Sequence, residues 1–142
     1  MIDVLVMIEV VKWLARDLHY KFQGPTFYAN HLLADRVKDF GSAEDDLKEG
    51  YWLGCLDTTP PDDKDIAELA TTTYNEIINA KPCLLTKLLE GLDRLDNSVG
   101  EAKKDASLNG GVHAILDDIS KRVNTYRFLV RAQSRVVESP AA

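Results

Sequence analysis

The sequence predicts an all-α fold, a single domain over residues 1–142 built around a bundle of four long helices. Two observations support this prediction. Apolar residues recur every three or four positions in four long segments, which is the spacing of one face of a helix. No stretch alternates apolar and polar residues as a half-buried strand would. Glycine and proline separate the segments and indicate where each helix begins and ends.

The first expected helix covers residues 2–22. Its apolar face consists of Val4, Leu5, Ile8, Val11, Leu14 and Leu18. Gly24 and Pro25 then end it, because glycine suits a helix C-terminus and proline cannot continue a helix. Charged residues interrupt this apolar start, and it lacks a basic beginning and a small-residue cleavage site. We therefore expect neither a signal peptide nor a membrane span.

The second expected helix covers residues 26–53, with Gly41 as its weak point. A glycine in a helix interior costs about 1 kcal/mol, and Ser42 with Asp45 three positions later could form a new capping box. Two helices are therefore an alternative. We expect one helix with a kink at Gly41, because the apolar positions before the glycine stay in phase with those after it.

Three further helices are expected beyond the loop at 57–62. A short one covers 63–72, the stretch 71–80 is ambiguous, and long helices cover 82–107 and 112–135. The connection between the second and third long helices is about 28 residues, enough to cross the bundle from end to end. Ferritin-like bundles have one such crossover.

The composition of the chain excludes some classes of binding partner. The chain has 17 Lys and Arg against 23 Asp and Glu, a net charge of −6. Such a surface does not favour nucleic-acid phosphate, which requires a basic patch. The two cysteines, Cys55 and Cys83, have no metal-binding spacing, so we expect plain thiols and a cytoplasmic protein.

Histidine and carboxylate side chains gather between His19 and Glu49. Four of them lie on the second expected helix, where each residue turns by about 100°. With His31 at zero, Asp35 falls near +40°, Asp45 near −40° and Glu49 near zero, a stripe about 80° wide. Core positions (Leu33, Val37, Phe40, Leu47 and Tyr51) cluster on the opposite side. This separation predicts a metal site at the surface.

These residues also carry a resemblance to a known family. The segment HYKFQGPTFYANH followed by Asp35 resembles the metal-site signature of the Dps family, the miniferritins, with Gly24, Phe27, His31 and Asp35 in place. The spacing DDLKE, from Asp45 to Glu49, resembles the family's acid pair. Near the end, GEAKKDAS and ILDDISKRVNTYRFLVRA resemble its third and last helices, so the similarity covers nearly the whole chain.

The resemblance implies a ferritin-like homo-oligomer, a hollow dodecamer that oxidises ferrous iron with peroxide or dioxygen and stores the product. It implies a metal site shared across a twofold interface. His19, His31 and Asp35 would come from one subunit, and Asp45 and Glu49 from its partner. Such ligands suit one or two Fe(II) ions, and Zn(II) could occupy the same positions.

The chain departs from the family pattern in four places. One residue is missing between Asp35 and the acid pair, which would rotate that pair by about 100° on an ideal helix. Tyr20 replaces a tryptophan, and Gly50 stands where arginine is common. The first helix starts almost at Met1 without a lysine-rich arm, so we do not expect DNA binding. The missing residue supports a second hypothesis, an oligomeric scaffold or interaction protein with a degenerate metal site.

Overall fold

The computed structural model describes residues 1–138, and within that range every regular element is helical. The all-α prediction is therefore confirmed. In chain order the elements are α1 (Ile2–Lys21), α2 (Phe27–Val37), α3 (Ala43–Leu47), the π-helix η1 (Lys48–Cys55), α4 (Asp63–Ala80), α5 (Leu84–Lys103) and α6 (Gly110–Glu138). None of the helices in the described part is long and apolar enough to cross a membrane.

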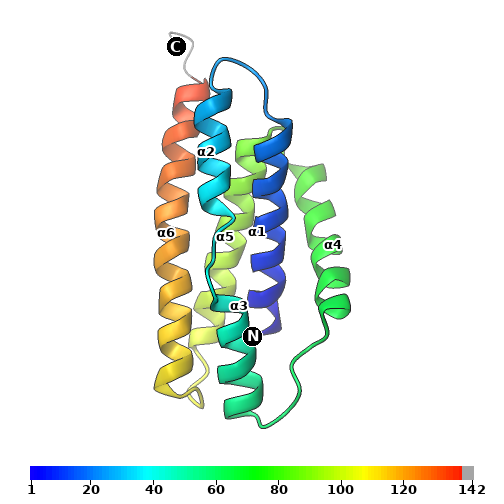
Figure 1. Ribbon diagram of the computed structural model, residues 1–142, viewed down its shortest axis with the longest axis vertical. Helices are drawn as coiled ribbons and strands as arrows, with labels where there is room; N and C mark the ends of the chain where they lie inside the picture. Colours follow the sequence, from blue (N-terminus) through cyan, green and yellow to red (C-terminus); the bar gives the residue numbers. More distant parts are fainter. Residues whose placement is uncertain (139–142) are drawn as a thin grey trace.

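Helices α1, α2, α5 and α6 run side by side along the long axis of the molecule (Figure 1). The chain ascends in α1, descends through α2, α3 and η1, ascends again in α4, descends in α5 and ascends in α6. The connection from η1 to α5 therefore passes from one end of the molecule to the other. Helix α4 forms part of this connection and packs mainly against α1.

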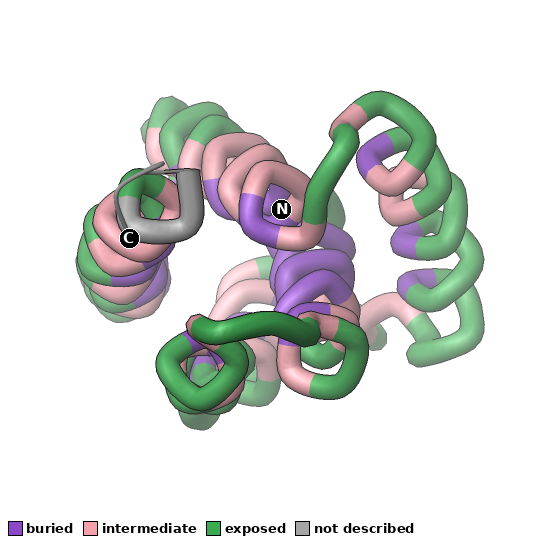
Figure 2. Tube along the Cα trace, turned by 90° about the horizontal axis from the view of Figure 1, so that it is seen from above, coloured by how far each residue is buried: buried purple, intermediate pink, exposed green. Residues whose placement is uncertain are grey.

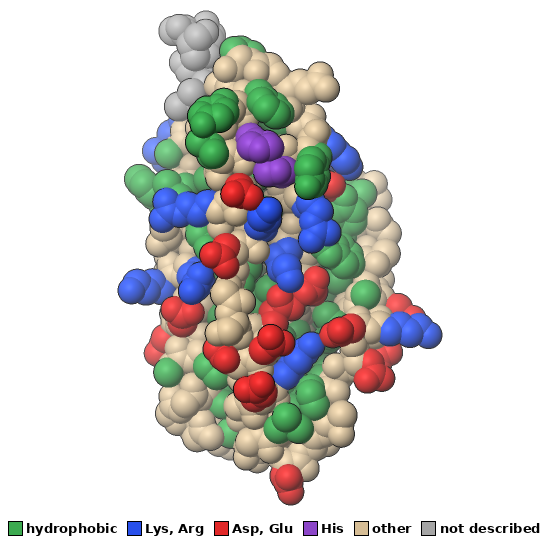
Figure 3. Space-filling model, viewed as in Figure 1, with side chains coloured by type: hydrophobic (Ala, Val, Ile, Leu, Met, Phe, Trp, Pro, Cys, Tyr) green, Lys and Arg blue, Asp and Glu red, His purple; other side chains and the backbone are tan. Residues whose placement is uncertain are grey.

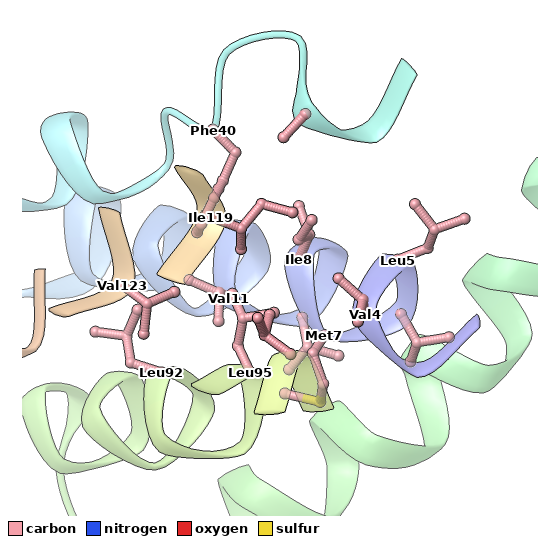
Figure 4. Packing of buried hydrophobic residues seen from close by; sticks show 14 of the residues in the cluster. Val4, Leu5, Met7, Ile8, Val11, Phe40, Leu92, Leu95, Ile119 and Val123 are labelled. Carbon is pink, nitrogen blue, oxygen red and sulfur yellow. The ribbon is translucent and has the colours of Figure 1, made fainter. Parts of the chain in front are cut away.

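The core lies between the helices, where α5 packs against both α1 and α6, and α1 packs against α2 and α4. Its largest fully buried side chains include Leu5, Ile8, Leu14, Leu18, Leu47, Ile77, Leu88, Leu92, Leu95, Leu116 and Ile119. Figure 4 shows such side chains from α1, α5 and α6 pointing toward one another, and Figure 2 shows buried residues on the inward sides of the helices. The apolar spacing in the sequence thus corresponds to the buried faces.

The prediction of one helix over 26–53 is wrong. Helix α2 ends at Val37, residues 38–42 leave the helical path, and α3 begins at Ala43. Gly41 has a φ of +58°, the left-handed region that glycine adopts without strain. The buried apolar positions before and after the break remain on the core side. Phe40, which is 4% exposed, packs into the core from the non-helical segment between them. The structure therefore has the alternative arrangement, in which a new helix starts after Ser42.

The short helix expected over 63–72 is also longer than predicted. Helix α4 continues to Ala80, because Ile66, Ala70 and Ile77 stay in phase and are all buried. The threonines that made the second half ambiguous are accommodated by bonds to the preceding turn: the Thr71 hydroxyl donates to the Ala67 carbonyl at 2.8 Å. The bounds of the two last helices differ from prediction by two to four residues.

Candidate metal centre

Two histidines from adjacent helices stack near one end of the molecule. His19 lies in the last turn of α1 and His31 in the first half of α2, and Gly24 and Pro25 turn the chain between them. Their ring centroids are 3.8 Å apart with an interplanar angle of 28°. The spacing of twelve residues therefore brings the two imidazole rings into stacking contact.

A hydrogen bond orients the ring of His31. Its Nδ1 lies 3.1 Å from the backbone carbonyl oxygen of His19. Because a carbonyl only accepts, Nδ1 carries the proton, and in the neutral ring the lone pair is on Nε2. Such a second contact commonly orients metal-binding histidines. Nδ1 of His19 is buried and has no hydrogen-bond partner among the described residues.

Asp35 lies one turn after His31 and is open to solvent. The Lys38 ammonium contacts its Oδ1 at 2.8 Å. The hydrogen bond and charge of Lys38, together with the nearby rings of His19 and His31, lower the pKa of Asp35 below its usual value. The carboxylate is therefore ionised at neutral pH, and the ammonium is the cation it now contacts.

Asp45 and Glu49 lie elsewhere. They follow the break at 38–42, Asp45 in α3 and Glu49 at the start of η1, and both are exposed. The histidines and Asp35 lie on α1 and α2, before the break, and the acid pair lies on α3 and η1, after it. The prediction that four of the ligands share one helix is wrong, because Gly41 interrupts it.

A single chain does not complete the site. Among residues 1–138, no three His, Cys, Asp or Glu side chains lie close enough together to hold a metal ion. We call His19, His31 and Asp35 the histidine cluster; the two rings stack, and the three side chains do not form a group that could hold a metal ion. Asp45 and Glu49 form a second cluster, which we call the acid pair. Each cluster alone provides too few ligands for a closed coordination sphere.

The histidine cluster is surrounded by exposed apolar side chains. Tyr20 is 71% exposed, Tyr28 is 73% exposed, and Phe27 and Leu32 are also exposed. Figure 3 shows hydrophobic side chains above and beside the histidines near one end of the face, charged side chains directly below them, and more acidic side chains toward the other end. Contiguous exposed apolar surface of this kind marks an interaction site.

A half-buried charge cluster joins α1 to α3 beside the acid pair. The Lys12 Nζ contacts Glu9 Oε1 at 3.2 Å and Glu44 Oε1 at 2.9 Å. Burial and the hydrogen bond with Glu9 raise the pKa of Glu44 to about 7. Burial opposes ionisation of Glu9 too, but its hydrogen bond with Glu44 and the Lys12 charge lower its pKa overall. The cluster lines a cleft of about 540 Å³ that also includes Asp45.

Sequence reasoning missed this cluster and Lys38. Glu9 and Glu44 are far apart in the chain, and no local pattern connects them. The contact of Lys38 with Asp35 could have been predicted from the sequence, since a lysine three positions after an aspartate on a helix lies beside it. Comparison with family models, with curated proteins and with solved structures gave no match for this chain.

Proposed function

We propose that the protein is a Dps-like homo-oligomer that binds Fe(II) between subunits and oxidises it. The observation that carries this proposal is the division of the candidate ligands into two incomplete clusters, with half-buried histidines and exposed Asp35 in one and the exposed acid pair in the other. A ligand cluster that one chain leaves open is completed when a second chain supplies the rest. The order of the helices, with a long crossover before α5, supports a ferritin-like four-helix bundle as the scaffold.

A twofold arrangement would pair the two clusters. A rotation of 180° about an axis near the break at 38–42 would place the histidine cluster of one copy against the acid pair of the other, twice. The charges support this pairing: the exposed cations Arg36 and Lys38 lie in sequence next to Asp35, whose carboxylate Lys38 contacts, and the exposed acids Asp45 and Glu49 follow the break. The exposed apolar side chains near the histidines would be covered by the same contact.

Fe(II) would be the substrate of this site. Neutral imidazole nitrogen and carboxylate oxygen are suitable ligands for it, and Zn(II) could compete for them. His31, held by the His19 carbonyl, would offer Nε2, and Asp35 would exchange Lys38 for the metal. Two Fe(II) ions would each give up one electron, and one hydrogen peroxide with two protons would accept both electrons to form two waters. The protein would provide ligands and geometry, and iron the redox chemistry. Further association into a hollow dodecamer would let the ferric product accumulate inside, as the resemblance implies.

The test is iron oxidation by purified protein. Fe(II) plus peroxide should give a rapid ferric absorbance in the wild type, and His31→Ala and Glu49→Gln should each slow it at least tenfold. His113→Ala and Glu68→Gln, on α6 and α4 and in neither cluster, are matched controls and should oxidise iron at the wild-type rate. Equal rates for the wild type and a His31→Ala/Glu49→Gln double variant would disprove the proposal.

A second candidate is an oligomeric scaffold with a degenerate metal site. The break at 38–42 favours it, because the acid pair no longer continues the helix of the histidines. Metal analysis after soaking with Fe(II) or Zn(II) distinguishes the two functions. Stoichiometric metal that depends on His31 supports the iron protein, and its absence supports the scaffold. Sedimentation velocity tests the oligomer separately, since a monomer would leave both clusters unpaired.

A further inference from the structure

The break between α2 and α3 is held by a side chain from α6. The hydroxyl of Tyr126 donates a hydrogen bond to the backbone carbonyl of Asp39, with an oxygen–oxygen distance of 2.5 Å. Tyr126 is 5% exposed, and its ring packs edge-on against Phe40 with centroids 5.8 Å apart. This hydrogen bond satisfies a carbonyl that the interrupted helix leaves without a regular partner.

Gly41 is contacted from the same helix. Its amide donates to Asp39 Oδ1 at 2.8 Å, and its φ is +58°. A Cβ at this position would lie 3.2 Å from Nη2 of Arg122, so the guanidinium lies directly against the glycine. Arg122 is in turn held by Asp118 at 3.2 Å. Helix α6 therefore contacts the backbone of the break at Asp39 and at Gly41.

The conformation of the break determines where the acid pair lies. Helix α3 begins at Ala43, immediately after the contacted segment, and Asp45 follows in its first turn. Since no continuous helix connects the histidine cluster to the acid pair, their relative position depends on residues 38–42. The ion pair of Lys12 with Glu44 anchors α3 to α1, and Tyr126 provides the matching anchor to α6.

We infer that Tyr126 is a positioning residue for the acid pair, acting through the Asp39 carbonyl. This inference rests on the proposed function, because it assigns the hydroxyl a role in metal binding by Asp45 and Glu49. In a continuous helix the backbone ladder would set the phase of these acids. Here contacts from other helices do so: Lys12 of α1 holds Glu44, and the Tyr126 hydroxyl of α6 holds the break that precedes α3.

The test compares Co(II) binding to full-length variants, since the visible spectrum and affinity of Co(II) report the ligand set directly. Tyr126→Phe keeps the ring against Phe40 and removes only the hydroxyl. We expect it to weaken Co(II) binding about tenfold and to shift the spectrum toward that of Glu49→Gln. In an Asp45→Asn/Glu49→Gln background, Tyr126→Phe should change neither affinity nor spectrum. Tyr74→Phe is the matched control, because it removes a tyrosine hydroxyl that contacts Asp17 rather than the break, and it should bind Co(II) as the wild type does.

Each outcome decides the inference. Wild-type binding by Tyr126→Phe, or an effect that persists in the background lacking the acid pair, overturns it. If His31→Ala weakens Co(II) binding while Tyr126→Phe does not, only this inference fails. If His31→Ala binds as the wild type does, the proposed function fails with it. Should Tyr126→Phe not fold, Arg122→Met provides the same comparison, with the same tenfold loss expected and the same results overturning it.

Discussion

The charge cluster of Glu9, Lys12 and Glu44 predicts that the protein loses stability as the pH rises above 5. The pKa of Glu44 rises from 4.5 to about 7 on folding, so between these values the folded chain holds a proton that the unfolded chain has lost. Stability falls with pH wherever the folded state binds more protons. The stabilisation is thus complete below pH 4.5 and is lost as the pH passes through 7.

The magnitude follows from the same shift. At about 1.4 kcal/mol per pKa unit, the full shift would correspond to roughly 3 kcal/mol. Partial solvent access reduces this figure, because water screens charges near the surface. The lowered pKa of Glu9 has the opposite effect on the free energy of unfolding, and only at acidic pH. We therefore expect this cluster to lower the free energy of unfolding by about 1–2 kcal/mol between pH 5 and pH 8.

Glu44→Gln tests this prediction, because the amide keeps the shape and hydrogen bonding but has no charge to bury. Urea unfolding at pH 5 and pH 8, at one protein concentration, should show a smaller decrease in the free energy of unfolding for the variant than for the wild type. The variant should be more stable at pH 8 by about 1–2 kcal/mol. Glu68→Gln, at an exposed ion pair on α4, is the control and should retain the wild-type pH dependence. An identical pH dependence for Glu44→Gln and wild type would refute the reasoning.

Two further predictions concern the core and the histidine cluster. Leu92→Ala removes a fully buried side chain from α5 and should destabilise the protein by about 2–5 kcal/mol in urea unfolding, owing to lost burial and the cavity left behind; a loss below 1 kcal/mol would contradict the packing described. Lys38→Met removes the ammonium that contacts Asp35. It should tighten Co(II) binding about threefold, since exposed ion pairs contribute up to about 1 kcal/mol. It should also raise the pKa of Asp35, because the hydrogen bond and charge of Lys38 lower that pKa. Lys64→Met is its control, and weaker or unchanged Co(II) binding in titrations of Lys38→Met would contradict a competing role for Lys38.

Local patterns predicted the helices well because each depends on residues near in sequence. Val4, Ile8 and Val11 recur at helical spacing and are buried in α1. Gly24 and Pro25 act through their own backbone preferences, and the turn between α1 and α2 lies where they are. The phase of Val37, Phe40 and Leu47 was also predicted, and all three are buried.

The break at Gly41 was not predicted, because the sequence offers both a kinked helix and a new start there. The balance is decided by α6, where Tyr126 and Arg122 contact the non-helical backbone, and these contacts join residues more than eighty positions apart. The same holds for the raised pKa of Glu44, which depends on α1 and α3 packing together so that Glu44 is buried against Glu9.

The sequence by itself therefore determined an all-α fold and the residue types of a candidate metal site. Periodicity and turn residues carry that information locally. Only the tertiary structure decided that His19 stacks on His31, that Asp35 contacts Lys38, and that the acid pair belongs to a separate helical segment. The physical reason is that these relations arise from packing between helices, where long-range contacts choose among local conformations of similar energy.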